Sequence, residues 1–180
     1  MLSEKQFCER TRVELRHLAD QVLSLVTDRD VYLRWEKELV ATSPQLRETH
    51  AFVDMVRGAY IDAMVFRALR LLEGSGSLSQ VLARIAEYPQ LRHDKVSDRE
   101  FADDRAGLQQ AATDLAQLQQ PHFSHRERTL PALESVHRAL NKALDAMSGN
   151  LQTYYWIVAE GHLDMDVKHD GDPLQGLRPA

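Results

Sequence analysis

The sequence is poor in cysteine and in uninterrupted apolar runs. Its only cysteine is Cys8, which excludes an intrachain disulfide and a zinc site built from several cysteines. This usage fits a reducing compartment, so we expect the chain in the cytoplasm. The first residues are polar and lack the apolar core of a secretory signal. The most apolar stretch, 51–72, carries five charged side chains, which excludes a membrane span because each charge costs several kcal/mol at the bilayer centre.

The composition indicates a globular chain without a broad basic surface. Apolar residues make up 43% and charged residues 27% of the 180 positions, which suits one domain with a proper core. The net charge is -5, so a phosphate-binding role requires a local cluster of cations in an acidic body. We expect a single helical bundle domain over 1–160 and a flexible acidic tail over 161–180.

Apolar residues recur with helical spacing, and no convincing strand alternation is present. The fold class is therefore predicted to be all-α, a helical bundle of about five to six helices. The expected helices are 3–26, a short second helix capped by Asp28 and Asp30, a third from Ser43 to Leu72, a fourth over 78–86, a fifth that a capping box of Ser97 and Glu100 opens and Pro121 interrupts, and a last from about 129 to 158.

Two of these helices carry distinctive apolar patterns. The third is apolar on most of its faces, which predicts a central helix covered by several neighbours. The last has an apolar seam that recurs every three or four residues and predicts packing within the bundle or pairing with a partner helix. The seam consists of Leu133, Val136, Leu140, Leu144, Met147, Leu151, Tyr154 and Val158.

The densest chemistry lies in the connection 120–128, between the last two helices. His122 and His125 are three residues apart, so their rings share a face in a helical turn. Arg126 and Arg128 add positive charge, which favours a neutral imidazole base and can hold a phosphate through two hydrogen bonds. Cleavage of RNA needs such a proton-transfer group and such a cation.

Simpler explanations for the histidines remain open. Histidines in exposed loops between helices are common and usually have no function. Two histidines also make a poor metal site, because a metal centre normally has three protein ligands. His17, His50 and His137 lie on other helices, and nothing in the sequence brings them together. We therefore expect no metal and no cofactor.

Three segments in this order resemble the HEPN superfamily of helical domains, and most closely its abortive-infection U-type branch from bacterial phage defence. Segment 68–73 ends a long apolar helix with a leucine pair and the acid Glu73. Segment 77–82 begins with serine and leucine after a glycine turn, as in that branch. Segment 118–127 lies where the family has an arginine, four to six further residues and a histidine. The resemblance covers about 52–158.

The resemblance implies a role for individual residues. In the active ribonucleases of the family, the motif arginine and histidine pair across a dimer and cleave RNA without metal. His125 matches the motif histidine, whereas Gln120 is the closest polar residue to the motif arginine. A neutral amide cannot replace a guanidinium at a developing phosphate charge, although Arg126 or Arg128 could supply that charge from the other side of His125. Glu73 resembles the family acid that orients the motif arginine.

These observations give two hypotheses. The first is an HEPN-like domain of a phage-defence or toxin-type system, an RNA-directed, metal-independent ribonuclease or a degenerate relative of one. It acts as a homodimer, with RNA and a cognate protein as candidate partners. Its catalytic residues are His125, His122 and Arg126, and its substrate-binding residues are Arg128, Arg70 and Glu73. The second is a non-catalytic helical module for protein interaction or nucleotide binding, suggested by the apolar seam and the missing motif arginine.

Overall fold

The computed structural model describes residues 3–43, 51–92, 94–118, 132–163 and 165. All regular structure within these ranges is helical, so the prediction of an all-α helical bundle is confirmed for them. The elements are α1 (Glu4–Thr42), α3 (Ala51–Glu73), α4 (Leu78–Ile85), a 3-10 helix η1 (Pro89–Leu91), α5 (Asp98–Ala116) and α6 (Leu133–Ala159).

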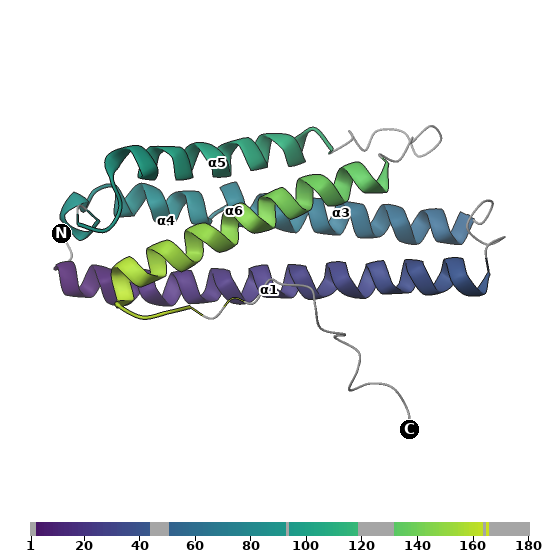
Figure 1. The fold of residues 1–180 in the computed structure, drawn as a ribbon, viewed down its shortest axis with the longest axis horizontal. Helices are drawn as coiled ribbons and strands as arrows, with labels where there is room; N and C mark the ends of the chain where they lie inside the picture. The colour runs from purple at the N-terminus through teal and green to yellow at the C-terminus, as the bar shows by residue number, and fades with distance from the viewer. Residues whose placement is uncertain (1–2, 44–50, 93, 119–131, 164, 166–180) are drawn as a thin grey trace, which may run out of the picture.

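The long helices lie side by side along the longest axis of the molecule (Figure 1). Helix α1 runs the length of the bundle, α3 and α4 follow one another beside it, and α6 crosses obliquely against them. Helix α6 contacts α1, α3 and α5, and α3 contacts α1, α4, α5 and α6. The apolar core accordingly draws its buried side chains from all five α-helices.

Helix α1 is continuous over 39 residues, so the predicted break at Asp28 and Asp30 is wrong. The segment contains no glycine and no proline, and a capping box at Ser3 fixes its start. The two aspartates make lateral contacts instead of capping a new helix. Asp28 forms an ion pair with Arg67 of α3, and Asp30 accepts a hydrogen bond of 3.2 Å from Arg29.

Helix α3 contacts α1, α4, α5 and α6, so the predicted packing against several neighbours is present, but one of its apolar faces is left uncovered. Ile61 and Met64 are buried against the other helices. Phe52, Met55 and Phe66 are 55%, 61% and 60% exposed. One apolar face of α3 therefore remains open to solvent among the described residues.

The apolar seam of α6 packs inside its own bundle. From Val136 to Tyr154 its six side chains are 0% exposed, and Val158 is 8% exposed. The alternative that this seam pairs with a partner helix is therefore wrong, because the side chains are already covered. A protein-interaction role needs a different surface.

The shorter elements follow their predicted signals. Helix α4 matches the predicted fourth helix within one residue, and the predicted capping box opens α5, where the backbone N–H of Ser97 donates to Glu100 at 2.8 Å. The predicted interruption at Pro121 lies outside the described residues, as does most of the tail predicted over 161–180.

Candidate functional site

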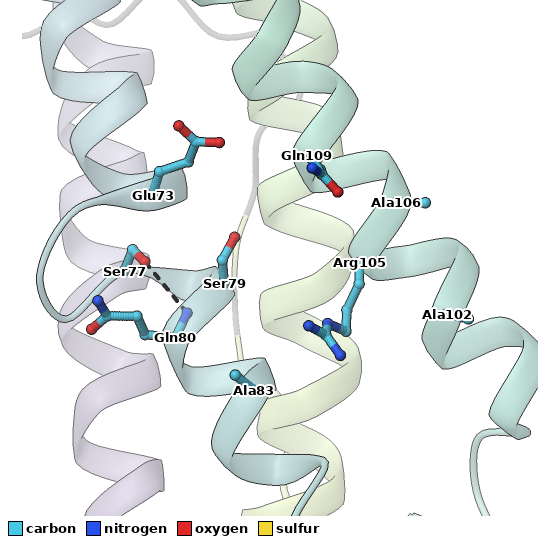
Figure 2. A pocket seen from close by; sticks show the side chains of 9 residues that line it. All are labelled: Glu73, Ser77, Ser79, Gln80, Ala83, Ala102, Arg105, Ala106 and Gln109. Atoms are coloured by element: carbon cyan, nitrogen blue, oxygen red, sulfur yellow. Dashed lines mark hydrogen bonds between the residues drawn. The ribbon is translucent and has the colours of Figure 1, made fainter.

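A groove lined by both polar and apolar groups lies between the end of α3, helix α4 and α5 (Figure 2). Its volume is about 510 Å³, within the range of small-molecule sites. The lining residues are Glu73 from α3, Ser77, Ser79, Gln80 and Ala83 from the start and body of α4, and Ala102, Arg105, Ala106 and Gln109 from α5.

Short side chains keep the groove open. Ala83 of α4 and Ala102 and Ala106 of α5 line it with single methyl groups (Figure 2). On α5, residues three and four apart share a face, so Arg105 and Gln109 project from the same side as the two alanines. The longer side chains of Arg105 and Gln109 thus lie beside alanines, whose methyl groups are too short to fill the space between the helices.

A tight turn holds the α3 and α4 walls together. Gly76 has φ +73°, a left-handed conformation that favours glycine. At Gly74 a Cβ atom would lie 2.5 Å from the carbonyl oxygen of Arg70, so only glycine fits. The side chain of Ser77 caps α4, and the Gly76 N–H donates to Oε1 of Gln80 at 3.0 Å. The turn thus fixes the end of α3 against the first turn of α4.

The groove carries one charge of each sign. The carboxylate of Glu73 comes from α3, and the guanidinium of Arg105 reaches in from α5 (Figure 2). Within the described ranges neither side chain forms an ion pair or a hydrogen bond. Arg105 lies above the ring of Phe101, with its Cζ 5.9 Å from the ring centroid. Both charges are exposed and available to a ligand.

Neutral polar groups lie beside these charges. The side chains of Ser79 and Gln109 line the groove and have no hydrogen-bond partner among the residues that the structure describes. A hydroxyl and an amide can each donate and accept. The groove therefore offers one cation, one anion and uncommitted neutral donors and acceptors to the same small molecule.

The structure bears on two of the predicted site residues. Glu73 lines the groove. Arg70 lies one turn earlier on α3, is exposed and does not line it. The catalytic candidates His125, His122 and Arg126 lie outside the described residues, and so do Arg128 and Gln120.

The sequence analysis missed Arg105 and Gln109. They lie more than 30 positions from Glu73 in the chain, and only the packing of α5 against α3 and α4 brings them near it. One local signal was present. Ala102 and Ala106 flank Arg105 on one helix face, and such small residues mark a place where a long side chain has room beside it.

A second polar cluster joins α1, α3 and α6. The rings of Tyr32 and Tyr60 stack with centroids 3.6 Å apart, and the Tyr60 hydroxyl shares a hydrogen bond of 3.2 Å with Nε2 of His137. Burial raises the pKa of Tyr60 and lowers the pKa of His137, so both are neutral near pH 7. Beside them, Arg57 donates to Glu36 at 3.1 Å. Tyr60 with His137 and Arg57 with Glu36 are paired inside the bundle, while the Tyr32 hydroxyl and Arg57 Nε are buried without a hydrogen-bond partner among the described residues. We assign the cluster to stability, because its ring stacking and its paired groups join three helices.

The described residues contain neither a cluster of metal ligands nor a membrane-spanning helix. No group of three or more His, Cys, Asp or Glu side chains there is placed to hold a metal ion. No helix in the described ranges is long and apolar enough to cross a membrane. Comparison of the chain with protein-family models, curated proteins and solved structures finds no match.

Proposed function

We propose that this chain is an HEPN-like, RNA-directed protein of a phage-defence or toxin-type system and that its groove holds one nucleotide unit. The supporting observation is that two of the three segments that carry the resemblance, 68–73 and 77–82, meet at this groove. They contribute Glu73, Ser77, Ser79 and Gln80 to its lining. The proposal includes action in the cytoplasm, with RNA as the substrate or ligand.

The polar groups of the groove match the parts of a ribonucleotide. Arg105 can hold a phosphate through two parallel hydrogen bonds. Glu73 can accept hydrogen bonds from ribose hydroxyls, and a contact to the 2'-hydroxyl distinguishes RNA from DNA. Gln109 can pair with a base edge through its amide. The volume of about 510 Å³ suits one such unit.

Charge limits the expected affinity. Arg105 is the one cation among the lining residues, and the whole chain has a net charge of -5. A single phosphate contact gives a weak dependence on salt, with a slope of about -0.7 for log K against log salt on single strands. We therefore expect modest binding that falls only slightly as salt rises.

Binding of RNA to the groove is tested by fluorescence anisotropy with a labelled single-stranded RNA and by competition with a nucleoside monophosphate. Arg105→Gln removes a charged hydrogen bond worth about 1.5–3 kcal/mol, so the affinity should fall about 10- to 100-fold. Arg99→Gln is the matched control, because Arg99 lies on the same helix, is exposed and does not line the groove. Equal loss in both variants contradicts the proposal, and so does wild-type protein that binds neither ligand.

Selectivity for ribose tests the second contact. Glu73→Gln keeps the shape of the side chain but weakens its acceptor for ribose hydroxyls. We expect this variant to bind RNA less tightly while its affinity for DNA of the same sequence is unchanged. A parallel loss for RNA and DNA contradicts the assignment of Glu73 to ribose.

The cleavage step rests on the connection outside the described residues. We propose His125 as the proton-transfer group with His122, and Arg126 with Arg128 as cations at the phosphate. Incubation of mixed RNA in EDTA should then give cleavage that His125→Ala abolishes. Binding without cleavage would identify a degenerate relative that retains only the groove.

A further inference from the structure

The open face of α3 forms a continuous apolar stripe. We call Phe52, Met55, Ala59, Ala63 and Phe66 the α3 stripe. All five are exposed, and the two phenylalanines and the methionine have more than half of their surface in solvent. Their spacing of three, four, four and three residues keeps them on one side of the helix. Scattered apolar residues on a surface need no explanation, but a stripe along 15 helix positions does.

The stripe is symmetrical about Ala59. The two phenylalanines lie seven positions before and after this alanine, at Phe52 and Phe66. Met55 and Ala63 lie four positions before and after it, so a long side chain on one half corresponds to a methyl group on the other. A two-fold interface requires such a self-complementary patch, because each contact from one copy to the other is repeated in reverse.

We propose that a second copy of this chain packs antiparallel on the α3 stripe, with the two-fold axis at Ala59. Phe52 of each copy then faces Phe66 of the other, and Met55 covers Ala63. The two Ala59 residues meet at the centre, where their small side chains let the helices approach to about 8 Å. The spacing of three and four residues is common to apolar helix stripes, so what selects a second copy is the order of side-chain sizes, which places a methyl group opposite each methionine.

The size of the stripe sets the strength of the association. Phenylalanine buries about 150–250 Å² when fully covered, so the exposed parts of Phe52, Met55 and Phe66 with the two alanines supply about 400–500 Å² per copy. The total of about 800–1,000 Å² is below the 1,200–2,000 Å² of stable complexes and falls among weak, reversible ones. We therefore expect a dimer with a Kd in the range of about 10–100 µM.

This pairing is independent of the proposed nucleotide site. No residue of the α3 stripe lines the groove. The antiparallel arrangement also separates equivalent ends of α3, because the two Ala51 residues lie 16 positions apart along the paired helices, about 24 Å. Each copy thus keeps its own groove, and loss of dimerisation leaves RNA binding unchanged.

Sedimentation velocity over about 1–300 µM protein tests the association. The wild type should shift from monomer to dimer with concentration, and Ala59→Glu should remain monomeric because two carboxylates would meet at the axis. Ala116→Glu, the same change at an exposed position of α5, should dimerise like the wild type. Circular dichroism checks that both variants keep their helical content. A wild type that is monomeric throughout, or a dimer insensitive to Ala59→Glu, overturns the proposal.

Cysteine cross-linking tests the register in a Cys8→Ser background. Ala59→Cys should form a disulfide-linked dimer, because the axis brings the two residues together. Phe66→Cys alone should not, but it should cross-link to Phe52→Cys when the two variants are mixed. Efficient self-linking through position 66, with none through position 59, overturns the antiparallel arrangement.

Discussion

The bond between α5 and α6 offers the sharpest test of the fold. The hydroxyl of Tyr154 donates to the carboxylate of Asp104 at 2.7 Å, and the tyrosine side chain is 0% exposed. Its ring meets Phe101 edge to face, with centroids 5.7 Å apart. Burial raises the pKa of Tyr154, so the hydroxyl keeps its proton throughout the neutral range. Tyr154→Phe removes this donor and leaves the ring packing intact.

The expected loss follows from the contact. A hydrogen bond to a charged group contributes about 1.5–3 kcal/mol, and Asp104 is half-buried, so water can replace part of the lost bond. We therefore expect the low end of that range, about 1.5 kcal/mol. For a chain of 180 residues each kcal/mol shifts the melting temperature by about 2–4 °C, which gives a fall of about 3–6 °C.

Urea denaturation measures the free energy of unfolding for Tyr154→Phe, with Tyr88→Phe as the matched control. The Tyr88 ring stacks on Phe7, and its hydroxyl has no hydrogen-bond partner among the described residues. The control should therefore change stability by less than about 0.5 kcal/mol. A double-mutant cycle with Asp104→Ala isolates the pair, and a coupling energy near zero refutes the reasoning.

Two further predictions concern pH and backbone geometry. Burial lowers the pKa of His137, so the unfolded chain binds a proton more readily than the folded one. The free energy of unfolding should therefore fall as the pH drops below about 6.5. In urea denaturation at a series of pH values, His137→Gln should make this fall less steep. An unchanged slope contradicts the assignment. Gly74→Ala should cost about 1–3 kcal/mol because its methyl group collides with backbone, whereas Gly107→Ala, with open space in α5, should add about 0.5–1 kcal/mol. If both glycine variants change the free energy of unfolding in the same direction, the described geometry of the turn is contradicted.

Local signals predicted the helices well where side chains mark their ends. The cap at Ser97 and the glycine turn before Ser77 act within one helical turn, so the sequence alone identifies the starts of α5 and α4. The predicted break at Asp28 failed for the opposite reason. An aspartate can cap a helix or pair sideways with another helix, and only the position of Arg67 on α3 decides between the two.

Local sequence signals could not predict how fully α3 is buried or which residues line the groove. The apolar pattern of α3 shows how many of its faces could be buried, but not how many neighbours the chain supplies. Four helices, α1, α4, α5 and α6, pack on α3, and Phe66 still stays exposed. Likewise, the resemblance pointed to Glu73, whereas the position of Arg105 on the opposite wall of the groove depends on how α5 packs against α3 and α4. The pairing of distant helices is set by the whole core, not by any one segment.

The uninterrupted length of α1 restricts how this chain can change in evolution. Adding one residue to an α-helix rotates everything beyond it by about 100°. If one residue were inserted midway between Leu15 and Tyr32, Leu15 could stay in the core, but Tyr32 would turn away from Tyr60, on which it stacks. Substitutions can accumulate on the solvent-exposed side of α1, but the number of residues between Leu15 and Tyr32 must stay constant. Homologous chains should therefore show gaps in the connections and none in this interval.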